Sequence, residues 1–351
     1  MNPYSKLEDY AFWSRSMSRP APSQIDPCVS GRIISPTDKV VTIGSCFAQH
    51  LGRFIRTSGL NYYVPEAGPD DMPETEKAIR NYGTFSGRYG NVYTVRQLNQ
   101  MFDRAFGLFS PEDDRWEHKG CLVDAFRPQI QPEGFGSESE LEADRASHLA
   151  YVRNIFTEAD FLIFTLGLTE GWRSKKDGAI YPVAPGVSGG TFDPVKYEFV
   201  NFTAAECEAD LAMFLEKLRG VNPRAEVILT VSPVPLIATY EPRHVWVSTT
   251  YSKAALRVAA DSAERNFPNV TYFPSYEIIT SPAAQGRYYA DDLRQVTDMG
   301  VKHVMRVFSK HFFSPGQVSS APASMPFHIV AQDNPGIVCD EEVIEKSLHQ
   351  N

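Results

Sequence analysis

The amino-acid sequence predicts an α/β protein with a doubly wound parallel sheet in a three-layer α/β/α arrangement. Three observations lead to this fold class. Short apolar, β-branched runs alternate along the chain with segments whose apolar residues recur at helical spacing. The runs are apolar at consecutive positions, as in strands that are covered on both faces. Alternating strands and helices in turn imply right-handed crossovers between parallel strands.

Five runs are expected to be strands, and four segments between them are expected to be helices. The expected strands are 39–44, 61–66, 160–167, 225–233 and 269–275. The expected helices are 46–59, 139–159, 204–223 and 250–269. The helical pattern is clearest in the third, whose apolar stripe consists of Cys207, Leu211, Phe214, Leu215 and Leu218. Gly220 and Pro223 mark its end.

The alternation breaks between about residues 66 and 138. This stretch contains a helix that begins near Thr94 and an aromatic, Pro-rich segment, and we expect it to be an insertion that caps one end of the sheet. The α/β domain itself is expected over residues 38–313. Residues 1–37 are expected to form an N-terminal arm and residues 314–351 a C-terminal tail, because both are rich in Pro, Ser and Gly.

Composition and charge limit the possible functions. The chain has 351 residues and a net charge of −9, with no basic block to neutralise nucleic-acid phosphates. We expect no secretory signal, and no apolar stretch approaches the roughly 18 residues of a membrane span. The cysteines are scattered and never form a C-x-x-C pair: Cys28, Cys46, Cys121, Cys207 and Cys339. We therefore expect a cytoplasmic protein without a disulfide framework, metal site or cofactor. The oligomeric state stays open.

The stretch TIGSCFAQHLG, residues 42–52, lies where the first expected strand gives way to a helix. Ser45 and Cys46 fall on the turn, and His50 follows one helical turn later. In a doubly wound sheet, ligands collect at the carboxyl ends of the strands. The free N–H groups and the dipole at the start of a helix stabilise an oxyanion or a thiolate. The turn is therefore a candidate catalytic site.

Two plainer interpretations of this turn stay open. Ser45 could be only the N-cap of the helix, and Cys46 only a small buried residue. A dinucleotide site is disfavoured, because GSCFAQHLG lacks the G-x-G-x-x-G pattern. Phe47 and Gln49 would also obstruct the close approach of a pyrophosphate to the backbone.

Several blocks of the sequence resemble one protein family. They are GSCFA (44–48), RYGNVYT (88–94), TLGLTEGW (165–172), TVSPVPLIATYEPRHV (230–245), YFPSYEI (272–278) and DDLRQVTDMGVKHVM (291–305). Over about residues 38–310 the chain resembles the GSCFA-domain proteins, a distant branch of the SGNH/GDSL hydrolase superfamily. The resemblance implies a flavodoxin-like fold of SGNH type. It also implies ester cleavage or acyl transfer, often of acetyl groups on carbohydrates.

The superfamily's first block reads Gly-Asp-Ser, with the serine as nucleophile. Counted from Gly44, Cys46 falls on that serine and Ser45 falls on the aspartate. Position thus favours Cys46, and side-chain identity favours Ser45. We lean to Cys46, because the geometry of the turn determines which side chain projects over the sheet. Both residues stay candidates.

The resemblance also implies residues of an oxyanion hole. The block Gly-x-Asn-Asp is similar to GLTE, which places Gly167 at the glycine and Thr169 at the asparagine. A threonine hydroxyl can donate one hydrogen bond to an oxyanion. Gly90 is the candidate for the glycine of another block, with Asn91 as a supplementary donor. A tight turn explains these two residues equally well.

The last block of the superfamily, Asp-x-x-His, is where this sequence departs from the pattern. DDLRQVT supplies Asp292 but has Gln295 at the histidine position, and a glutamine cannot act as a general base. His244 ranks first as a substitute because it follows the fourth strand. His50 ranks second because it shares a helix face with the turn, and His303 ranks third. Each could instead be a surface or packing histidine. A thiolate nucleophile also needs less proton abstraction.

The leading function is ester hydrolysis or acyl (acetyl) transfer on a carbohydrate or small acylated substrate, through an acyl-enzyme at Cys46 or Ser45. Glu170 and Asp292 would orient or polarise the groups of the catalytic site. Alternatively, Glu170 pairs with Arg173 at the surface. Aromatic side chains of the insertion could stack on sugar rings or belong to the core: Phe85, Tyr89, Tyr93 and Trp116.

The alternative is a catalytically degenerate glycan-binding or assembly module, which the missing histidine favours. A thiol redox sensor at Cys46 is disfavoured, because no resolving cysteine lies nearby in the sequence.

Overall fold

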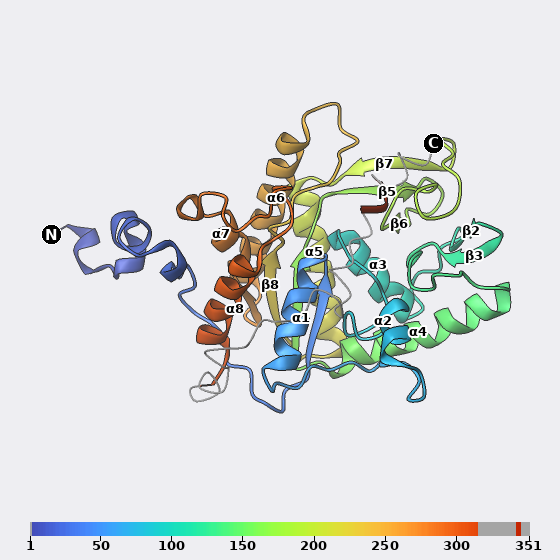
Figure 1. Ribbon diagram of the computed structural model, residues 1–351, viewed down its shortest axis with the longest axis horizontal. Coiled ribbons are helices and arrows are strands. Elements are labelled where there is room, and N and C mark those ends of the chain that lie inside the picture. Colours follow the sequence, from blue (N-terminus) through green and yellow to red (C-terminus); the bar gives the residue numbers. More distant parts are fainter. Residues whose placement is uncertain (1, 315–341, 345–351) are drawn as a thin grey trace.

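A computed structural model of the protein describes residues 2–314 and 342–344. Its central sheet has four parallel strands in the order β1-β4-β8-β9 (Figure 1). Their bounds are β1 (Val40–Gly44), β4 (Phe161–Leu166), β8 (Glu226–Val231) and β9 (Val270–Tyr272). The predicted α/β class with a parallel sheet is confirmed. The tail predicted at 314–351 lies outside the described residues, except for Ser314 and 342–344.

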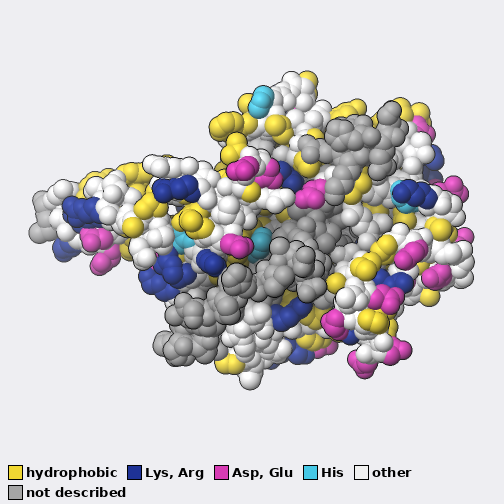
Figure 2. Space-filling model, in the orientation of Figure 1, with side chains coloured by type: hydrophobic (Ala, Val, Ile, Leu, Met, Phe, Trp, Pro, Cys, Tyr) yellow, Lys and Arg dark blue, Asp and Glu magenta, His cyan; other side chains and the backbone are white. Residues whose placement is uncertain are grey.

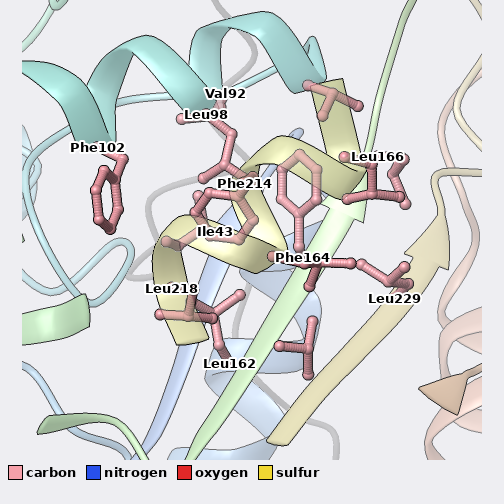
Figure 3. Packing of buried hydrophobic residues seen from close by; sticks show 14 of the residues in the cluster. Ile43, Val92, Leu98, Phe102, Leu162, Phe164, Leu166, Phe214, Leu218 and Leu229 are labelled. Carbon is pink, nitrogen blue, oxygen red and sulfur yellow. The ribbon is translucent and has the colours of Figure 1, made fainter. Parts of the chain in front are cut away.

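Helices cover both faces of this sheet. Successive side chains of a strand point to opposite faces, and β4 and β8 are apolar at consecutive positions, so both faces must be buried. One face buries Leu162, Phe164 and Leu229 (Figure 3). The helices on that face are α3 (Val95–Ala105), α4 (Glu138–Glu158), α5 (Ala204–Val221) and α6 (Val245–Asn266). The other face buries Ile163 and Ile228. Its helices are α1 (Phe47–Thr57), α7 (Ser275–Thr280) and α8 (Asp298–Phe312).

The strand predicted at 61–66 is wrong in extent. Only Tyr62 pairs with the sheet, through an isolated parallel bridge to Val40. The Val40 N–H donates to the Asn61 carbonyl, and the Tyr63 N–H donates to the Val40 carbonyl, both at 2.9 Å. The next N–H that could bond to β1 would be that of residue 65, two positions after Tyr63. This residue is Pro65, which has no N–H, so the ladder ends there. The bridge nevertheless lies at the outer edge of β1, where a flavodoxin-like sheet has its second strand.

Two small antiparallel sheets were not predicted. One has the order β6-β5-β7, and the other pairs β2 with β3. Their strands are β2 (Arg115–His118), β3 (Cys121–Asp124), β5 (Glu170–Ser174), β6 (Ile180–Tyr181) and β7 (Tyr197–Asn201). The β2–β3 hairpin lies apart from the central sheet (Figure 1).

The stretch 66–138, expected to be a cap, contains α2 (Glu74–Ile79), α3 and the β2–β3 hairpin. Thr94 caps α3 in a capping box with Gln97, which confirms that a helix begins there. This helix packs within the core on one face of the sheet rather than over its end.

The N-terminal arm projects from the body of the protein (Figure 1, Figure 2). It contains the short turns η1 (Pro3–Lys6), η2 (Asp9–Ala11), η3 (Ser14–Ser18) and η4 (Pro22–Gln24). The arm meets α8 where the Ile34 N–H donates to the Phe312 carbonyl at 2.8 Å. Within the described residues, no helix combines the length and apolar character that crossing a bilayer requires.

The carboxyl end of β1 approaches β4 too closely for a side chain. Gly44 pairs with Thr165 in the parallel register and has a φ of +138°. A Cβ atom at Gly44 would lie 2.8 Å from the Thr165 amide nitrogen and closer still to its carbonyl oxygen. Only glycine therefore fits this position.

We predict that Gly44→Ala lowers the free energy of unfolding by about 2–4 kcal/mol, because the new methyl group meets backbone atoms at a strained φ. Chemical denaturation measures this change. The matched control is Gly220→Ala, since Gly220 is exposed in α5 and a Cβ atom there would have no neighbour within 4 Å. That control should be neutral or slightly stabilising. Equal effects of the two substitutions would contradict the steric argument.

Candidate functional site

The turn between β1 and α1 lies at the carboxyl end of the sheet, as predicted. The Ser45 N–H donates to the Thr165 carbonyl at 3.2 Å, which ties the turn to β4. Cys46 occupies the N-cap of α1, and its side chain makes no capping hydrogen bond. The interpretation of Ser45 as the N-cap is therefore wrong.

Both candidate nucleophiles are buried. Ser45 and Cys46 are each 3% exposed, and the Cys46 thiol is free. The Ser45 hydroxyl oxygen has no hydrogen-bond partner among the described residues. A Cβ atom built on Gly167 would lie 3.0 Å from the Ser45 Cβ, so the serine packs against the backbone just beyond β4. The hydroxyl is thus enclosed at the junction of two strand ends.

The first turn of α1 offers backbone donors at the same place. The Ala48 and Gln49 amides are already bonded, to the Ser45 and Cys46 carbonyls at 2.9 and 3.1 Å. The amides of Cys46 and Phe47 donate to no residue in the described part of the chain. Free N–H groups at a helix start, together with its dipole, favour negative charge. This position could hold the oxyanion of an acyl-transfer reaction.

The segment 89–94 closes over the turn and brings some predicted residues to it. The Val92 N–H donates to the Gly44 carbonyl at 2.9 Å, and the Gly167 N–H donates to the Tyr93 carbonyl at 3.1 Å. Gly90 has a φ of +69°, so a tight turn suffices to explain it. Asn91 is buried, and its Oδ1 accepts from the Gln49 side chain of α1 at 3.5 Å. Asn91 and Gly167 therefore lie beside the turn.

Thr169 and Glu170 follow Gly167 but have other partners. The Thr169 hydroxyl donates to Asn201 Oδ1 at 2.7 Å, so its proton is not directed at an oxyanion. The Glu170 carboxylate accepts from the Thr239 hydroxyl at 2.7 Å, and burial raises its pKa. The alternative role of Glu170, a surface pair with Arg173, is not found, because Arg173 pairs with Glu198.

The structure does not place His244 near the turn. It is exposed at the N-cap of α6, where its Nδ1 accepts from the Trp246 N–H at 3.1 Å. The residue of α6 that approaches the turn is Lys253, nine positions later by residue number. That separation is about 13 Å along the helix axis. His244 therefore lies away from both nucleophile candidates.

The remaining members of the predicted acid–base group do not meet the turn either. His303 is buried between the Tyr288 hydroxyl at 2.7 Å and the Ile25 carbonyl at 2.6 Å, which is a packing role. Asp292 is exposed, and its Oδ1 accepts from the Gln295 N–H at 2.9 Å. No described imidazole pairs with Asp292.

His50 is half-buried on α1, and its ring lies 5.5 Å from the ring of Phe47. Burial lowers its pKa to about 4, and the positive charge of Arg53 contributes to this lowering. The imidazole is therefore neutral at pH 7 and a weak base. Within the described residues it makes no hydrogen bond to Ser45 or Cys46.

Lys253 was not among the predicted site residues. It is 1% exposed in the middle of α6, and its Nζ donates to the Gly167 carbonyl at 2.7 Å. The backbone of Gly167 thus contacts both this amine and Ser45. A signal was available, because Lys253 lies on the same helical stripe as the buried Leu256 and Ala260. A lysine on an apolar stripe is unusual unless it has a specific role.

The aromatic side chains proposed for sugar stacking belong to the core instead. Phe85, Tyr89, Tyr93 and Trp116 are all buried. An accessible aromatic cluster lies elsewhere, around Trp172 of β5, whose ring is 4.9 Å from that of Tyr240. Tyr240 is 65% exposed, and its amide lies 3.4 Å from the Glu170 carboxylate. In residues 2–314 and 342–344, no group of His, Cys, Asp and Glu is arranged to hold a metal ion.

We predict that His50 makes the protein less stable as the pH falls from about 6.5 to 4. Its folded-state pKa is about 4, against 6.5 for an unperturbed histidine, so the unfolded chain binds the proton first in this range. His50→Asn should lose less stability between pH 7 and 4.5 than the wild type in chemical denaturation. Thr57→Asn is the control, because Thr57 is exposed on the same helix and does not titrate, and it should keep the wild-type slope. An NMR titration that places His50 near pH 6.5 would refute the assignment.

Comparison with known proteins assigns the family. The GSCFA family model matches residues 39–308. The match begins just before β1 and ends within α8, so it includes the central sheet, the turn and the helices on both faces. A search of curated proteins found no match. Because the family model covers more than half of the chain, the protein belongs to the GSCFA family.

Proposed function

We propose that the protein is an acyl-transfer enzyme, either an ester hydrolase or an acyl (acetyl) transferase, whose acyl-enzyme forms on the turn between β1 and α1. The observation that supports this most is the Ser45 hydroxyl, which is buried without a hydrogen-bond partner among the described residues. Burying such a group costs about 1–3 kcal/mol. Most buried polar groups in proteins are hydrogen-bonded, so a buried hydroxyl without a partner needs an explanation. A role in catalysis is one such explanation.

The chemistry needs a base, and Lys253 is the candidate in place of the missing histidine. The Ser45 oxygen or the Cys46 sulfur attacks the carbonyl carbon of the ester. Lys253, in its neutral amine form and turned from the Gly167 carbonyl toward the nucleophile, accepts the proton. The carbonyl oxygen becomes an oxyanion that the Cys46 and Phe47 amides face. The leaving alcohol then takes the proton from Lys253, and water or an acceptor hydroxyl removes the acyl group. Serine–lysine pairs perform this chemistry in unrelated folds.

A carbohydrate substrate is supported by the aromatic cluster around Trp172 and Tyr240. Exposed apolar patches on a protein surface often mark ligand-binding or protein-binding sites. The cluster is joined to Glu170, which lies three residues after Gly167 in the sequence. Three residues of extended chain span about 10 Å, so a sugar stacked on the cluster would place an attached acyl group within reach of the turn.

The second candidate is a glycan-binding or assembly module without catalytic activity. Two observations favour it: Ser45 and Cys46 are each only 3% exposed, and no described imidazole is hydrogen-bonded to either. The aromatic cluster would serve such a module equally well, so covalent chemistry has to be measured directly.

We predict that 4-nitrophenyl acetate transfers its acetyl group to one residue of the turn. Peptide mass spectrometry should locate the adduct on Ser45 or Cys46, and alanine substitution of that residue should abolish it. Cys121→Ala is the control for unspecific thiol acetylation, because Cys121 is more accessible than the buried Cys46. Wild-type protein that is never acetylated on the turn, yet binds oligosaccharide, would identify the binding module instead.

We predict that Lys253→Ala slows acetylation of the turn by about 10²- to 10⁴-fold, the usual contribution of a general base. Circular dichroism checks that the variant is folded, and added methylamine should restore part of the rate by replacing the missing amine. The pH dependence of the rate should also change, which a purely structural role would not cause. A folded variant that reacts as fast as the wild type would exclude Lys253 as the base.

A further inference from the structure

A cavity of about 30 Å³ lies beside α3, behind the segment that closes over the turn. Its lining includes Asn91, Val92, Arg104, Phe126, Arg127 and His148. A buried water needs roughly 10–15 Å³. The cavity therefore has room for two water molecules or one small anion.

Arg104 is the unusual member of this lining. Its guanidinium lies 4.0 Å from the centre of the Phe126 ring, and its Nη2 is buried without a hydrogen-bond partner. It forms no ion pair with any residue in the described part of the chain. Burial lowers its pKa to about 10, so the group is still charged at pH 7. The side chain as a whole is partly buried, and a buried donor without a partner costs about 1–3 kcal/mol.

Arg127 lines this cavity and a second one of about 10 Å³, and it also has an unsatisfied donor. It is 3% exposed and pairs with Asp124 at 3.0 Å and with Asp144 at 2.8 Å. Its Nη1 is nevertheless buried and has no hydrogen-bond partner among the described residues. Two guanidinium groups thus line one small cavity, each with unused N–H donors.

The carboxylates around the cavity are bonded to groups other than Arg104, and one of them, Glu66, is hydrogen-bonded to His148 at 2.8 Å. Asp124 accepts from Arg127 and from Arg145, the latter at 3.1 Å. Asp144 is shared by Arg127 and Arg88, each at 2.8 Å. Asp124 lies near enough to raise the pKa of Arg104, but it is not bonded to it. Asp114 also raises the pKa of Arg104. Arg104 therefore has counter-charges nearby, but its Nη2 has no hydrogen-bond acceptor among the described residues.

We propose that this cavity is a binding site for a small monovalent anion, a halide or a one-carbon carboxylate, held by the free N–H groups of Arg104 and Arg127. Guanidinium groups bind anions through charge-assisted hydrogen bonds, and the cavity volume excludes larger anions. This inference is independent of the acyl-transfer proposal.

The anion site adjoins the segment that closes over the turn. Val92 lines the cavity and also donates its N–H to the Gly44 carbonyl at 2.9 Å. Asn91 lines it too and accepts from Gln49 of α1. A bound anion would therefore contact the segment 89–94 on the side that faces away from the turn.

The test measures the thermal unfolding midpoint in a series of buffers of constant ionic strength. Along the series, sodium gluconate is replaced stepwise by sodium chloride or by sodium formate. Gluconate is too large for the cavity and serves as the reference anion. The wild-type midpoint should rise and saturate with chloride or with formate, because an anion that binds only the folded state stabilises it. In Arg104→Gln this rise should be lost.

The matched control is Arg153→Gln. Arg153 also lies over a phenylalanine ring, 5.0 Å from that of Phe106, and its Nε donates to the Ala105 carbonyl outside the cavity. This variant should keep the wild-type response. A wild type that responds no more to chloride or formate than to gluconate would mean that the cavity holds only water, and a saturable response that persists in Arg104→Gln would also overturn the proposal.

A second measurement does not depend on the folding of a variant. Wild-type crystals soaked in sodium bromide should show an anomalous scattering peak between Arg104 and Arg127. Peaks confined to the protein surface would overturn a halide site, and formate density in the cavity would then be required for the carboxylate alternative.

Discussion

The absence of a side chain at Gly44 is the constraint on which the candidate site depends. The backbones of β1 and β4 come into contact at this point, and a Cβ atom would lie 2.8 Å from the Thr165 nitrogen. The unusual φ of Gly44 ends the strand and directs the chain into α1. Ser45 is consequently held against Gly167, and the first amides of α1 are held above the sheet. Separation of the two strand ends would disperse all of these groups together.

The fold could be predicted where burial determines the residue pattern. β4 and β8 are covered on both faces, so their apolar runs were unambiguous. The prediction was wrong for 61–66, where only Tyr62 pairs with the sheet. The β6-β5-β7 sheet was missed because β5 and β7 are only partly buried and carry charged residues. Strands of this kind owe their conformation to their neighbours more than to their own sequence.

The candidate site could be predicted only in its local part. The turn, the glycine before it and the helix after it are neighbours in the sequence, so their geometry follows from local patterns. Lys253 reaches Gly167 across 86 residues, and such a contact depends on how α6 packs. His244 was ranked first because it follows the fourth strand, which says nothing of how far the next helix extends. His244 lies at the start of this helix of 22 residues, and the contact with Gly167 is made about two and a half turns later, by Lys253.

The backbone bonds that hold the segment 92–93 over the turn set a condition on access. Val92 is bonded to Gly44, and the Tyr93 carbonyl accepts from Gly167 and Leu168. Breaking these bonds costs about 0.5–1.5 kcal/mol each, and lifting the segment would also expose the buried side chains of Val92 and Tyr93, so an open form would be a rare one. The reagent would encounter that minor form alone. The speed at which the thiol or hydroxyl is labelled would then report how often the loop lifts rather than how reactive the atom beneath it is.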